Sequence, residues 1–174
     1  MDIRKATRDD LKAVANIYDE ICNACEKGLA ATGWQKGVYP TGKTAESALQ
    51  RGDLFVICDS DNVLGSAIIN QVQVDVYANA PWKHNADDKE VMVLHTLAIS
   101  PSYKGKGFGK AFVTFYEEYA LQNGCTELRM DTREENIAAR AMYKKLGYLE
   151  IGAVSCEFNG IKGVTLVLLE KTLN

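Results

Sequence analysis

A turn of alternating lysines and glycines has the composition of an anion-binding site. It reads Lys104-Gly105-Lys106-Gly107-Phe108-Gly109-Lys110. Glycine has no Cβ atom, so its backbone can take positive φ angles and a ligand can come close to the chain. An apolar run over 91–99 precedes the turn, and it is followed by aromatic residues at helical spacing, namely Phe108, Phe112, Phe115 and Tyr119. Free N–H groups at a helix start favour an anion. The order of strand, cationic turn and helix therefore predicts a phosphate site.

Two common phosphate-binding motifs do not fit this turn. A P-loop ends in Gly-Lys-Ser/Thr, but the glycine spacing differs here, and Ala111 stands where the hydroxyl that binds Mg²⁺ would be. A dinucleotide-binding motif needs Gly-x-Gly-x-x-Gly, and Lys110 occupies the position of its third glycine. We therefore expect the ligand to be held by backbone amides without a metal ion. A flexible solvated turn is the alternative interpretation.

The elements that must position the turn follow from the apolar pattern, which alternates between strand and helix periods. Strands are predicted at 3–6, 54–58, 63–72, 91–99, 126–131, 148–158 and 164–169. Helices are predicted at 11–21, 44–50, 108–123 and 136–146, and two irregular segments lie at 26–43 and 73–90. This order, with one strand–helix–strand crossover, predicts an α/β fold with a mixed sheet. Without repeats or a linker, 1–174 is expected to be a single domain.

Composition argues against several functional classes. The chain of 174 residues is 47% apolar, which is typical of a globular protein. Its net charge of −3 argues against nucleic-acid binding as the main task. No apolar run approaches the length of a membrane span, and the residues after Met1 turn polar at once. A cytoplasmic protein that does not bind membranes or nucleic acid is therefore expected.

The cysteines favour reduced structural thiols. There are five, an odd number, and only Cys22 and Cys25 have the spacing of a metal or redox motif. A second pair of ligands at zinc spacing is missing from the sequence, and the motif falls at the end of a predicted helix instead of after a strand. We therefore expect neither a metal site nor disulfides.

The turn resembles the acetyl-coenzyme A loop of the GNAT superfamily of N-acetyltransferases, whose usual pattern is Gln/Arg-x-x-Gly-x-Gly/Ala. Lys104 stands where the family has Gln or Arg, which keeps the charge but loses a planar donor. A second stretch, Asn136-x-x-Ala139-x-x-x-Tyr143-x-x-x-Gly147-Tyr148, resembles the motif that follows in these enzymes. The element order is also similar to the GNAT fold along nearly the whole chain. The resemblance implies a mixed, mostly antiparallel sheet flanked by helices.

The same resemblance implies how the backbone would bind acetyl-CoA. Backbone groups of Leu97, Ala98 and Ile99 would pair with the pantetheine arm as if it were an added strand. The turn Lys104–Lys110 would hold the phosphates. The N–H of Leu97 would face the thioester oxygen, which gains negative charge during acyl transfer.

Two side chains of the second motif have implied roles as well. Tyr143 matches the family's general acid, which would protonate the thiolate that leaves as coenzyme A. Because Tyr143 shares a helical stripe with Met142 and Leu146, a core aromatic is the alternative interpretation. Asn136 matches the residue that holds the coenzyme arm, and it can also act as a plain helix cap.

The reaction also needs a general base. An amine such as that of lysine has a pKa of about 10.4, so only about one molecule in 10³ is neutral and nucleophilic at pH 7. Many GNAT enzymes carry a glutamate near the position of Val93, and valine cannot accept a proton. His95 is the first candidate, since two-residue periodicity predicts that it shares a face with Leu97 and Ile99. A hydrogen-bonded core histidine is the alternative, and Asp131 is the second candidate base.

The acceptor is predicted only by class. A primary amine of a small molecule, an amino acid or a peptide fits the implied reaction, and four loop aromatics are candidates to line its pocket, namely Trp34, Tyr39, Tyr77 and Trp82. An acyltransferase for a longer acyl-CoA and a non-catalytic acyl-CoA sensor are the alternatives. A homodimer is one expectation for the oligomeric state, because chains of this family often form dimers.

Overall fold

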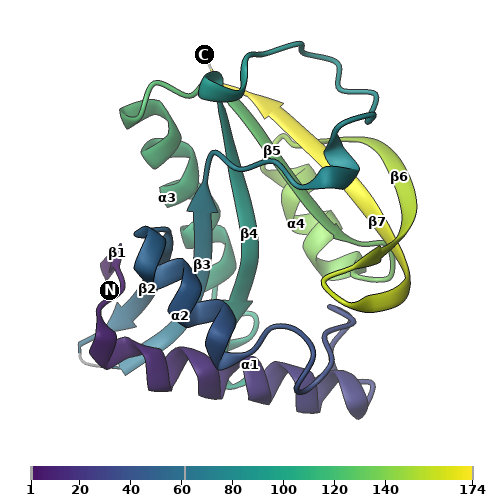
Figure 1. Ribbon diagram of the computed structural model, residues 1–174. Helices are drawn as coiled ribbons and strands as arrows, with labels where there is room; N and C mark the ends of the chain where they lie inside the picture. The colour runs from purple at the N-terminus through teal and green to yellow at the C-terminus, as the bar shows by residue number, and fades with distance from the viewer. Residues whose placement is uncertain (1, 61, 174) are drawn as a thin grey trace.

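Seven strands form a mixed sheet at the centre of the computed structural model, which describes residues 2–60 and 62–173 (Figure 1). The strands are β1 (Asp2–Lys5), β2 (Leu54–Asp59), β3 (Asn62–Asn70), β4 (Val91–Ile99), β5 (Glu127–Arg133), β6 (Leu149–Phe158) and β7 (Ile161–Thr172). They lie in the order β1-β2-β3-β4-β5-β7-β6. Only β4 and β5 run parallel, and the other neighbouring pairs of the described sheet are antiparallel. The predicted mixed, mostly antiparallel sheet is confirmed.

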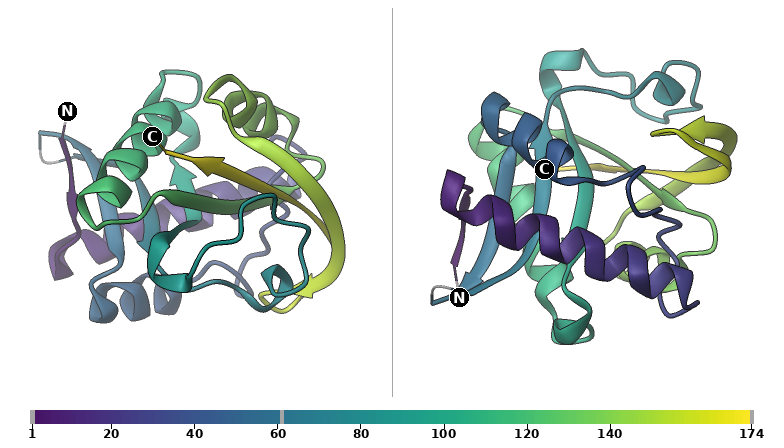
Figure 2. Two further views of the ribbon diagram at one scale, coloured as in Figure 1. Left: turned by 90° about the horizontal axis from the view of Figure 1, so that it is seen from above. Right: turned by 60° about the horizontal axis from the view of Figure 1, so that its bottom comes forward.

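Helices cover both faces of this sheet (Figure 2). They are α1 (Leu11–Glu26), α2 (Gly42–Arg51), α3 (Phe108–Gln122) and α4 (Ile137–Lys145), with short 3-10 turns η1 (Arg8–Asp10), η2 (Asp75–Tyr77), η3 (Asp88–Glu90) and η4 (Pro101–Tyr103). α1 and α2 pack on one face over β2 and β3, and α3 and α4 pack on the other. The irregular segment 73–90 covers the first face where it passes over β5 and β7.

Three apolar clusters follow this division of the two faces. One lies under α3 and α4 and contains Phe112, Tyr116 and Met130. A second lies under α1 and α2, and a third lies under the segment 73–90 around Tyr77 and Leu168. The segment 73–90 thus takes the place of a helix as the covering layer, because its side chains bury the C-terminal half of the first face.

The predicted elements are all present, and their ends differ by a few residues. α1 continues to Glu26, so that Cys22 and Cys25 lie in its last turns, and the five cysteines of the described chain are free. β7 begins at Ile161, three residues before its predicted start, because Asn159 and Gly160 take φ angles of 52° and 78° and form a tight hairpin turn. Within the described residues, no helix combines the length and the apolar composition that crossing a membrane requires.

Candidate active site

The parallel strands β4 and β5 separate at the end where β4 leads into the lysine–glycine turn. They pair only over 91–94 and 127–130, although β4 continues to Ile99 and β5 to Arg133. The backbone edge of β4 beyond its paired part therefore borders a gap in the sheet. An extended ligand can hydrogen-bond to such an edge as an added strand.

A β-bulge lies at the mouth of this gap. Between the pairs Ile68–His95 and Ser66–Ala98, β4 holds one residue more than β3. Thr96, inside this interval, takes a φ angle of 49°, which β-branched residues rarely adopt. The extra residue bends the strand and interrupts the regular alternation of its side chains.

The bulge changes which side chains share a face of β4. Leu97 and Ile99 pack with the α3–α4 cluster, as Leu94 does. Val93 belongs to the cluster on the other face, and His95 follows it two residues later, opposite Ile68. The prediction that His95 shares a face with Leu97 and Ile99 is therefore wrong, because the inserted residue exchanges the two faces beyond His95.

The lysine–glycine turn lies between η4 and α3, as the sequence predicts. Gly105 and Gly107 have φ angles of 79° and 88°, and Gly107 is the N-cap of α3. Apart from each glycine and its two chain neighbours, no described residue has an atom within 4 Å of the point where a Cβ atom would be. The first turn of α3 begins at Phe108 and includes Gly109 and Lys110. The turn is therefore free of close packing on the sides where the two Cβ atoms would lie.

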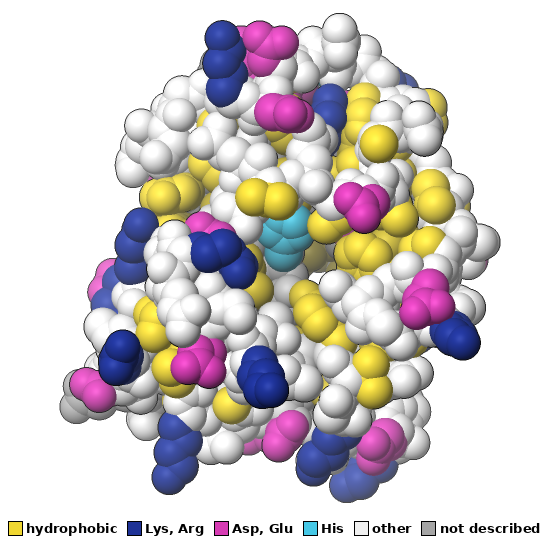
Figure 3. All heavy atoms as spheres, viewed as in Figure 1, with side chains coloured by type: hydrophobic (Ala, Val, Ile, Leu, Met, Phe, Trp, Pro, Cys, Tyr) yellow, Lys and Arg dark blue, Asp and Glu magenta, His cyan; other side chains and the backbone are white. Residues whose placement is uncertain are grey.

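A cavity of about 540 Å³ reaches the gap between β4 and β5. Its lining brings Leu97 and Tyr143 together with His95 and Asp131. The turn Lys104–Lys110 lies beyond this lining within the described part of the chain. The same face of the molecule is hollowed near its centre, where a histidine and several apolar side chains are visible (Figure 3).

Tyr143 lines the cavity and also packs in the core. Its ring is 6% exposed and makes an edge contact with Tyr148, with ring centroids 5.9 Å apart. Burial, and then the charge of Asp131, raise the pKa of Tyr143 well above its usual range. The hydroxyl is therefore protonated at neutral pH, as a general acid must be. Its role as that acid stays a prediction.

Asn136 caps α4, and it also lines the cavity. Its Oδ1 accepts a hydrogen bond from the N–H of Ala139 at 3.4 Å, and its Nδ2 donates to Oγ1 of Thr132 at 3.3 Å. The predicted cap is confirmed. A contact with the coenzyme arm stays a prediction.

Asp131 lines the cavity from β5, and its carboxylate accepts one hydrogen bond from the described residues. The hydroxyl of Tyr77 donates to its Oδ2 at 2.7 Å. Burial raises the pKa of Asp131 to about 6, and the hydrogen bond from Tyr77 limits this rise. A carboxyl group with this pKa is ionised at pH 7 and can accept a proton.

His95 is fixed in a different environment. Its Nε2 lies 3.0 Å from Oδ1 of Asn70 and 3.1 Å from the carbonyl oxygen of Val72, so Nε2 carries the proton and donates to these acceptors. Asn70 in turn donates to Asp53, which accepts a hydrogen bond from Arg51. Burial lowers the pKa of His95 to about 4. The imidazole is therefore neutral at pH 7 and weakly basic.

The four loop aromatics divide into two pairs. Trp34 and Tyr39 line the cavity and stack edge to face, with centroids 6.4 Å apart. The hydroxyl of Tyr39 also hydrogen-bonds to that of Thr96 at the bulge. Tyr77 and Trp82 pack beneath the segment 73–90, outside the lining in the described part of the chain. Tyr77 is connected to the site by its hydrogen bond to Asp131.

Several residues of the cavity carried no signal that sequence reasoning used. The β6–β7 hairpin contributes an apolar wall of Phe158, Ile161, Val164 and Leu166. Arg133 reaches across the mouth so closely that a Cβ atom at Gly33 would fall 1.7 Å from its Nη1. The Asn-Gly turn predicts the hairpin, but its approach to β4 depends on the sheet order.

The described residues, 2–60 and 62–173, hold no group of three or more His, Cys, Asp or Glu side chains arranged to bind a metal ion. The functional side chains around the cavity include a carboxylate, a neutral imidazole, phenol hydroxyls, two arginines, and the hydroxyls and amides of several threonine, serine and asparagine residues.

Comparison with known proteins agrees with this arrangement. Residues 15–148 match the acetyltransferase (GNAT) family. An uncharacterized N-acetyltransferase of Methanocaldococcus jannaschii is 27% identical over 154 residues, which cover 85% of this chain and 60% of that protein. The chain therefore spans less than two thirds of the length of this curated relative, and it spans smaller shares of others that it matches.

Solved structures share the fold. An acetyltransferase of the GNAT family from Streptococcus agalactiae superposes with a TM-score of 0.82 and 21% identity, covering 99% of this chain and 95% of that one. An acetyltransferase of Salmonella typhimurium, solved with its cofactor acetyl-CoA, has a TM-score of 0.71 and 15% identity, with 100% and 94% of the two chains covered. These likenesses show that the arrangement of strands and helices is that of the family.

Proposed function

Because the chain belongs to the acetyltransferase (GNAT) family, we propose that it transfers the acetyl group of acetyl-CoA to the primary amine of a small molecule, an amino acid or a peptide. The amine attacks the thioester directly while both substrates are bound. One observation carries this proposal: a single cavity joins the open edge of β4 at Leu97 and the phenol of Tyr143 with the carboxylate of Asp131.

The open edge of β4 and the turn suit acetyl-CoA. The gap beyond 91–94 gives an extended pantetheine arm a backbone edge to pair with, at Leu97, Ala98 and Ile99. The positive φ angles of Gly105 and Gly107 open the start of α3 to the phosphates. Lys104, Lys106 and Lys110 of the same turn add positive charge near them.

Asp131 is the better placed of the two candidate bases. A general base works best when its pKa lies near the working pH. The pKa of Asp131, about 6, meets this condition, whereas burial lowers the pKa of His95 to about 4. As the amine forms its bond to the carbonyl carbon, its proton passes to Asp131, which releases it to solvent before the next turnover. His95 acts as a neutral part of the acceptor wall.

Tyr143 and Leu97 serve the other half of the reaction. The N–H of Leu97 stabilises the negative charge on the carbonyl oxygen while the carbon is tetrahedral. When the carbon–sulfur bond breaks, the phenol of Tyr143 donates its proton to the sulfur, and solvent returns a proton to Tyr143. Burial favours the neutral phenol before this step, which keeps the acid loaded.

The acceptor wall is largely apolar. Trp34 and Tyr39 face the cavity from the segment between α1 and α2, and Phe158 and Leu166 face it from the β6–β7 hairpin. An amine with an apolar body fits such a wall, since burying its carbon atoms releases water from both surfaces.

The experiment is a screen for coenzyme A thiol released from acetyl-CoA, with a panel of alkylamines, arylalkylamines, amino acids and short peptides. We expect release that depends on an amine, with one acetyl group added to the acceptor by mass spectrometry. Tyr143→Phe should lower kcat by about 10²-fold, the range for loss of a general acid, and leave acetyl-CoA affinity unchanged.

Tyr148→Phe is the matched control, because Tyr148 makes an edge contact with Tyr143 in the same core cluster but is not among the described residues that line the cavity. Its kcat should stay near that of the unmodified protein. Acetyl-CoA binding by calorimetry without turnover for any amine would instead indicate a non-catalytic binding module. A kcat for Tyr143→Phe equal to that of the unmodified protein would return Tyr143 to a packing role.

A further inference from the structure

Three charged residues alternate along β5 on one face of the sheet. They are Glu127, Arg129 and Asp131, while Leu128 and Met130 between them pack under α3 and α4. Glu127 and Arg129 are only 8% and 6% exposed, so this charged row is covered. Buried charges are costly unless they are paired or hydrogen-bonded. The covering segment, 73–90, supplies the partners.

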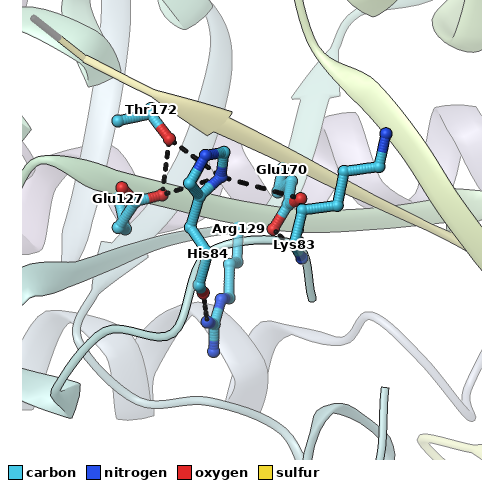
Figure 4. Close-up of polar contacts among 6 residues, drawn as sticks. All are labelled: Lys83, His84, Glu127, Arg129, Glu170 and Thr172. Atoms are coloured by element: carbon cyan, nitrogen blue, oxygen red, sulfur yellow. Dashed lines mark hydrogen bonds and ion pairs between the residues drawn. The ribbon is translucent and has the colours of Figure 1, made fainter. Parts of the chain in front are cut away.

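Arg129 fastens the middle of that segment. Its Nη2 donates to the carbonyl oxygen of His84 at 3.0 Å, and its Nη1 donates to Oε1 of Gln73 at 2.5 Å. The guanidinium also lies 4.4 Å from the ring centre of Trp82, within the range of a cation–π contact. Figure 4 shows Arg129 reaching the backbone of His84 from β5.

A second set of contacts ties the same segment to β7 and to the start of β5. The N–H of Lys83 donates to both carboxylate oxygens of Glu170, at 2.9 and 3.2 Å. Oγ1 of Thr172 lies 3.1 Å from Nδ1 of His84 and donates to Glu127 at 3.0 Å (Figure 4). The segment 73–90 is thus attached to the sheet at several points and does not hang as a free loop.

Tyr77 is the residue that this attachment brings to the candidate active site. It is 2% exposed, and its ring makes an edge contact with that of Trp82, with centroids 5.1 Å apart. Nε1–H of Trp82 donates to the carbonyl oxygen of Tyr77 at 2.9 Å. The Tyr77 backbone and ring are therefore both held, and the hydroxyl meets Oδ2 of Asp131 at 2.7 Å.

We propose that Tyr77 is a positioning residue for Asp131. The Tyr77 hydroxyl holds one oxygen of the Asp131 carboxylate, so that the other oxygen faces the acceptor amine. The inference rests on the proposed function, in which Asp131 is the base. A hydroxyl that donates to a carboxylate favours its charged form. Tyr77 therefore both orients the base and keeps it ionised at neutral pH, without touching either substrate.

The other groups around Asp131 are neutral or paired elsewhere, so the effect of the Tyr77 hydrogen bond on the pKa of Asp131 can be measured. Tyr143 on α4, Tyr39 before α2 and Cys156 on β6 are neutral acids at pH 7, because burial, together with the charge of Asp131, raises the pKa of each. The arginines of its own strand are engaged elsewhere, Arg129 with Gln73 and Arg133 with Glu135. His95, across the cavity on β4, is neutral near pH 6.

The test is the pH dependence of kcat/KM for Tyr77→Phe. The unmodified protein should show an acidic limb with a midpoint near pH 6, where Asp131 ionises. Without the hydroxyl, the midpoint should move upward by roughly half a pH unit or more, and kcat on the plateau should fall several-fold. The KM for acetyl-CoA should not change. A ¹³C-NMR titration of the labelled Asp131 carboxyl should show the same shift without turnover.

Tyr116→Phe is the matched control. Tyr116 is also a fully buried tyrosine, and its hydroxyl donates to the carbonyl oxygen of Met92 on the other face of the sheet. This variant loses a comparable buried hydrogen bond but not one to Asp131. It should lower the melting temperature as much as Tyr77→Phe and leave the limb in place. If Tyr77→Phe does not fold, Trp82→Phe releases the Tyr77 carbonyl and should move the limb the same way.

Asp131→Asn separates the two hypotheses. If Asp131 is the base, this variant loses the limb, and adding Tyr77→Phe to it changes nothing further. Loss of the limb in Asp131→Asn together with an unmoved limb and NMR midpoint in Tyr77→Phe would overturn the positioning role alone. An Asp131→Asn variant that keeps the limb and the rate would overturn the base, and the role of Tyr77 with it.

Discussion

The two walls of the cavity each present a titratable side chain, and burial moves the two pKa values in opposite directions. His95 on β4 becomes less basic, with a pKa of about 4, and Asp131 on β5 becomes less acidic, with a pKa of about 6. In both, removal from water disfavours the charged form. The buried histidine therefore stays neutral across the physiological pH range, while the pKa of the buried aspartate moves close to that range.

The hydrogen bonds of the two walls reinforce this difference. Asn70 and the Val72 carbonyl occupy the protonated nitrogen of His95 and fix the ring. Tyr77 donates to Oδ2 of Asp131, and because no other described residue hydrogen-bonds to Oδ1, that oxygen is open to a ligand. The wall at Asp131 is therefore suited to proton transfer, and the wall at His95 is suited to fixing the shape of the cavity.

The largest expected effect comes from removing the charge of Asp131. Asp131→Asn keeps the size of the side chain and an oxygen for Tyr77, but it cannot accept the amine proton. We expect kcat at pH 7.5 to fall by about 10²–10⁴-fold, the usual contribution of a general base. Steady-state kinetics measure this, with acetyl-CoA affinity by calorimetry as the control. A fall of less than tenfold would mean that Asp131 is not the general base, and that the two walls do not differ in their part in proton transfer.

The second effect concerns stability. Asp131 binds a proton more readily in the folded chain, with a pKa of about 6, than at its ordinary value of 3.8. Protonation of Asp131 therefore adds fully to the free energy of unfolding below pH 4, and this contribution is lost as the pH rises through 6. Asp131→Asn should raise the free energy of unfolding at pH 8 by about 1–3 kcal/mol and leave it unchanged near pH 4. Urea unfolding at both pH values measures this.

Asp19→Asn, an exposed position on α1, is the control for that comparison and should give no difference between the two pH values. Equal stability of Asp131→Asn and the unmodified protein at pH 8 would show that the buried carboxylate costs nothing. The idea that the chain loses stability by keeping an ionisable base at Asp131 would then have no support.

The smallest effect is expected at His95. His95→Gln keeps an N–H donor for Asn70 and the Val72 carbonyl, so the wall should retain its shape. We expect the acidic limb of kcat/KM to stay near pH 6 and kcat to fall by less than about tenfold, since proton transfer is unaffected. A pH–rate profile of this variant checks it. Disappearance of the limb would make His95 the base and reverse the comparison.

Most of the fold could be predicted from the sequence, because its signals are local. Apolar periodicity located the strands and helices, and residues with special backbone angles, such as Gly107 and the pair Asn159-Gly160, marked the starts and turns. The lysine–glycine turn and the Asn136–Tyr143 motif are likewise short continuous stretches at the start of a single helix each. Their positions in the structure agree with the prediction for this reason.

The parts that could not be predicted depend on contacts between distant elements. Val91 to Leu94 are apolar on both faces, so the sequence pattern cannot show where the alternation of β4 is interrupted. The contact between Tyr77 and Asp131 joins residues far apart in the chain, one of them in an irregular segment. Alternating charges along β5 usually mark a solvated face, and here they mark a face that another segment covers.

The bulge in β4 has a consequence for how this chain tolerates insertions and deletions. Up to His95 the odd-numbered residues belong to the acceptor face, and from Leu97 they belong to the opposite face. Because Thr96 is the extra residue, deleting it would restore regular alternation with Leu97 still on the face opposite His95, whereas an insertion or deletion at another position of β4 would exchange the faces of the side chains on one side of it. The active site thus depends on a count of residues as much as on their identities.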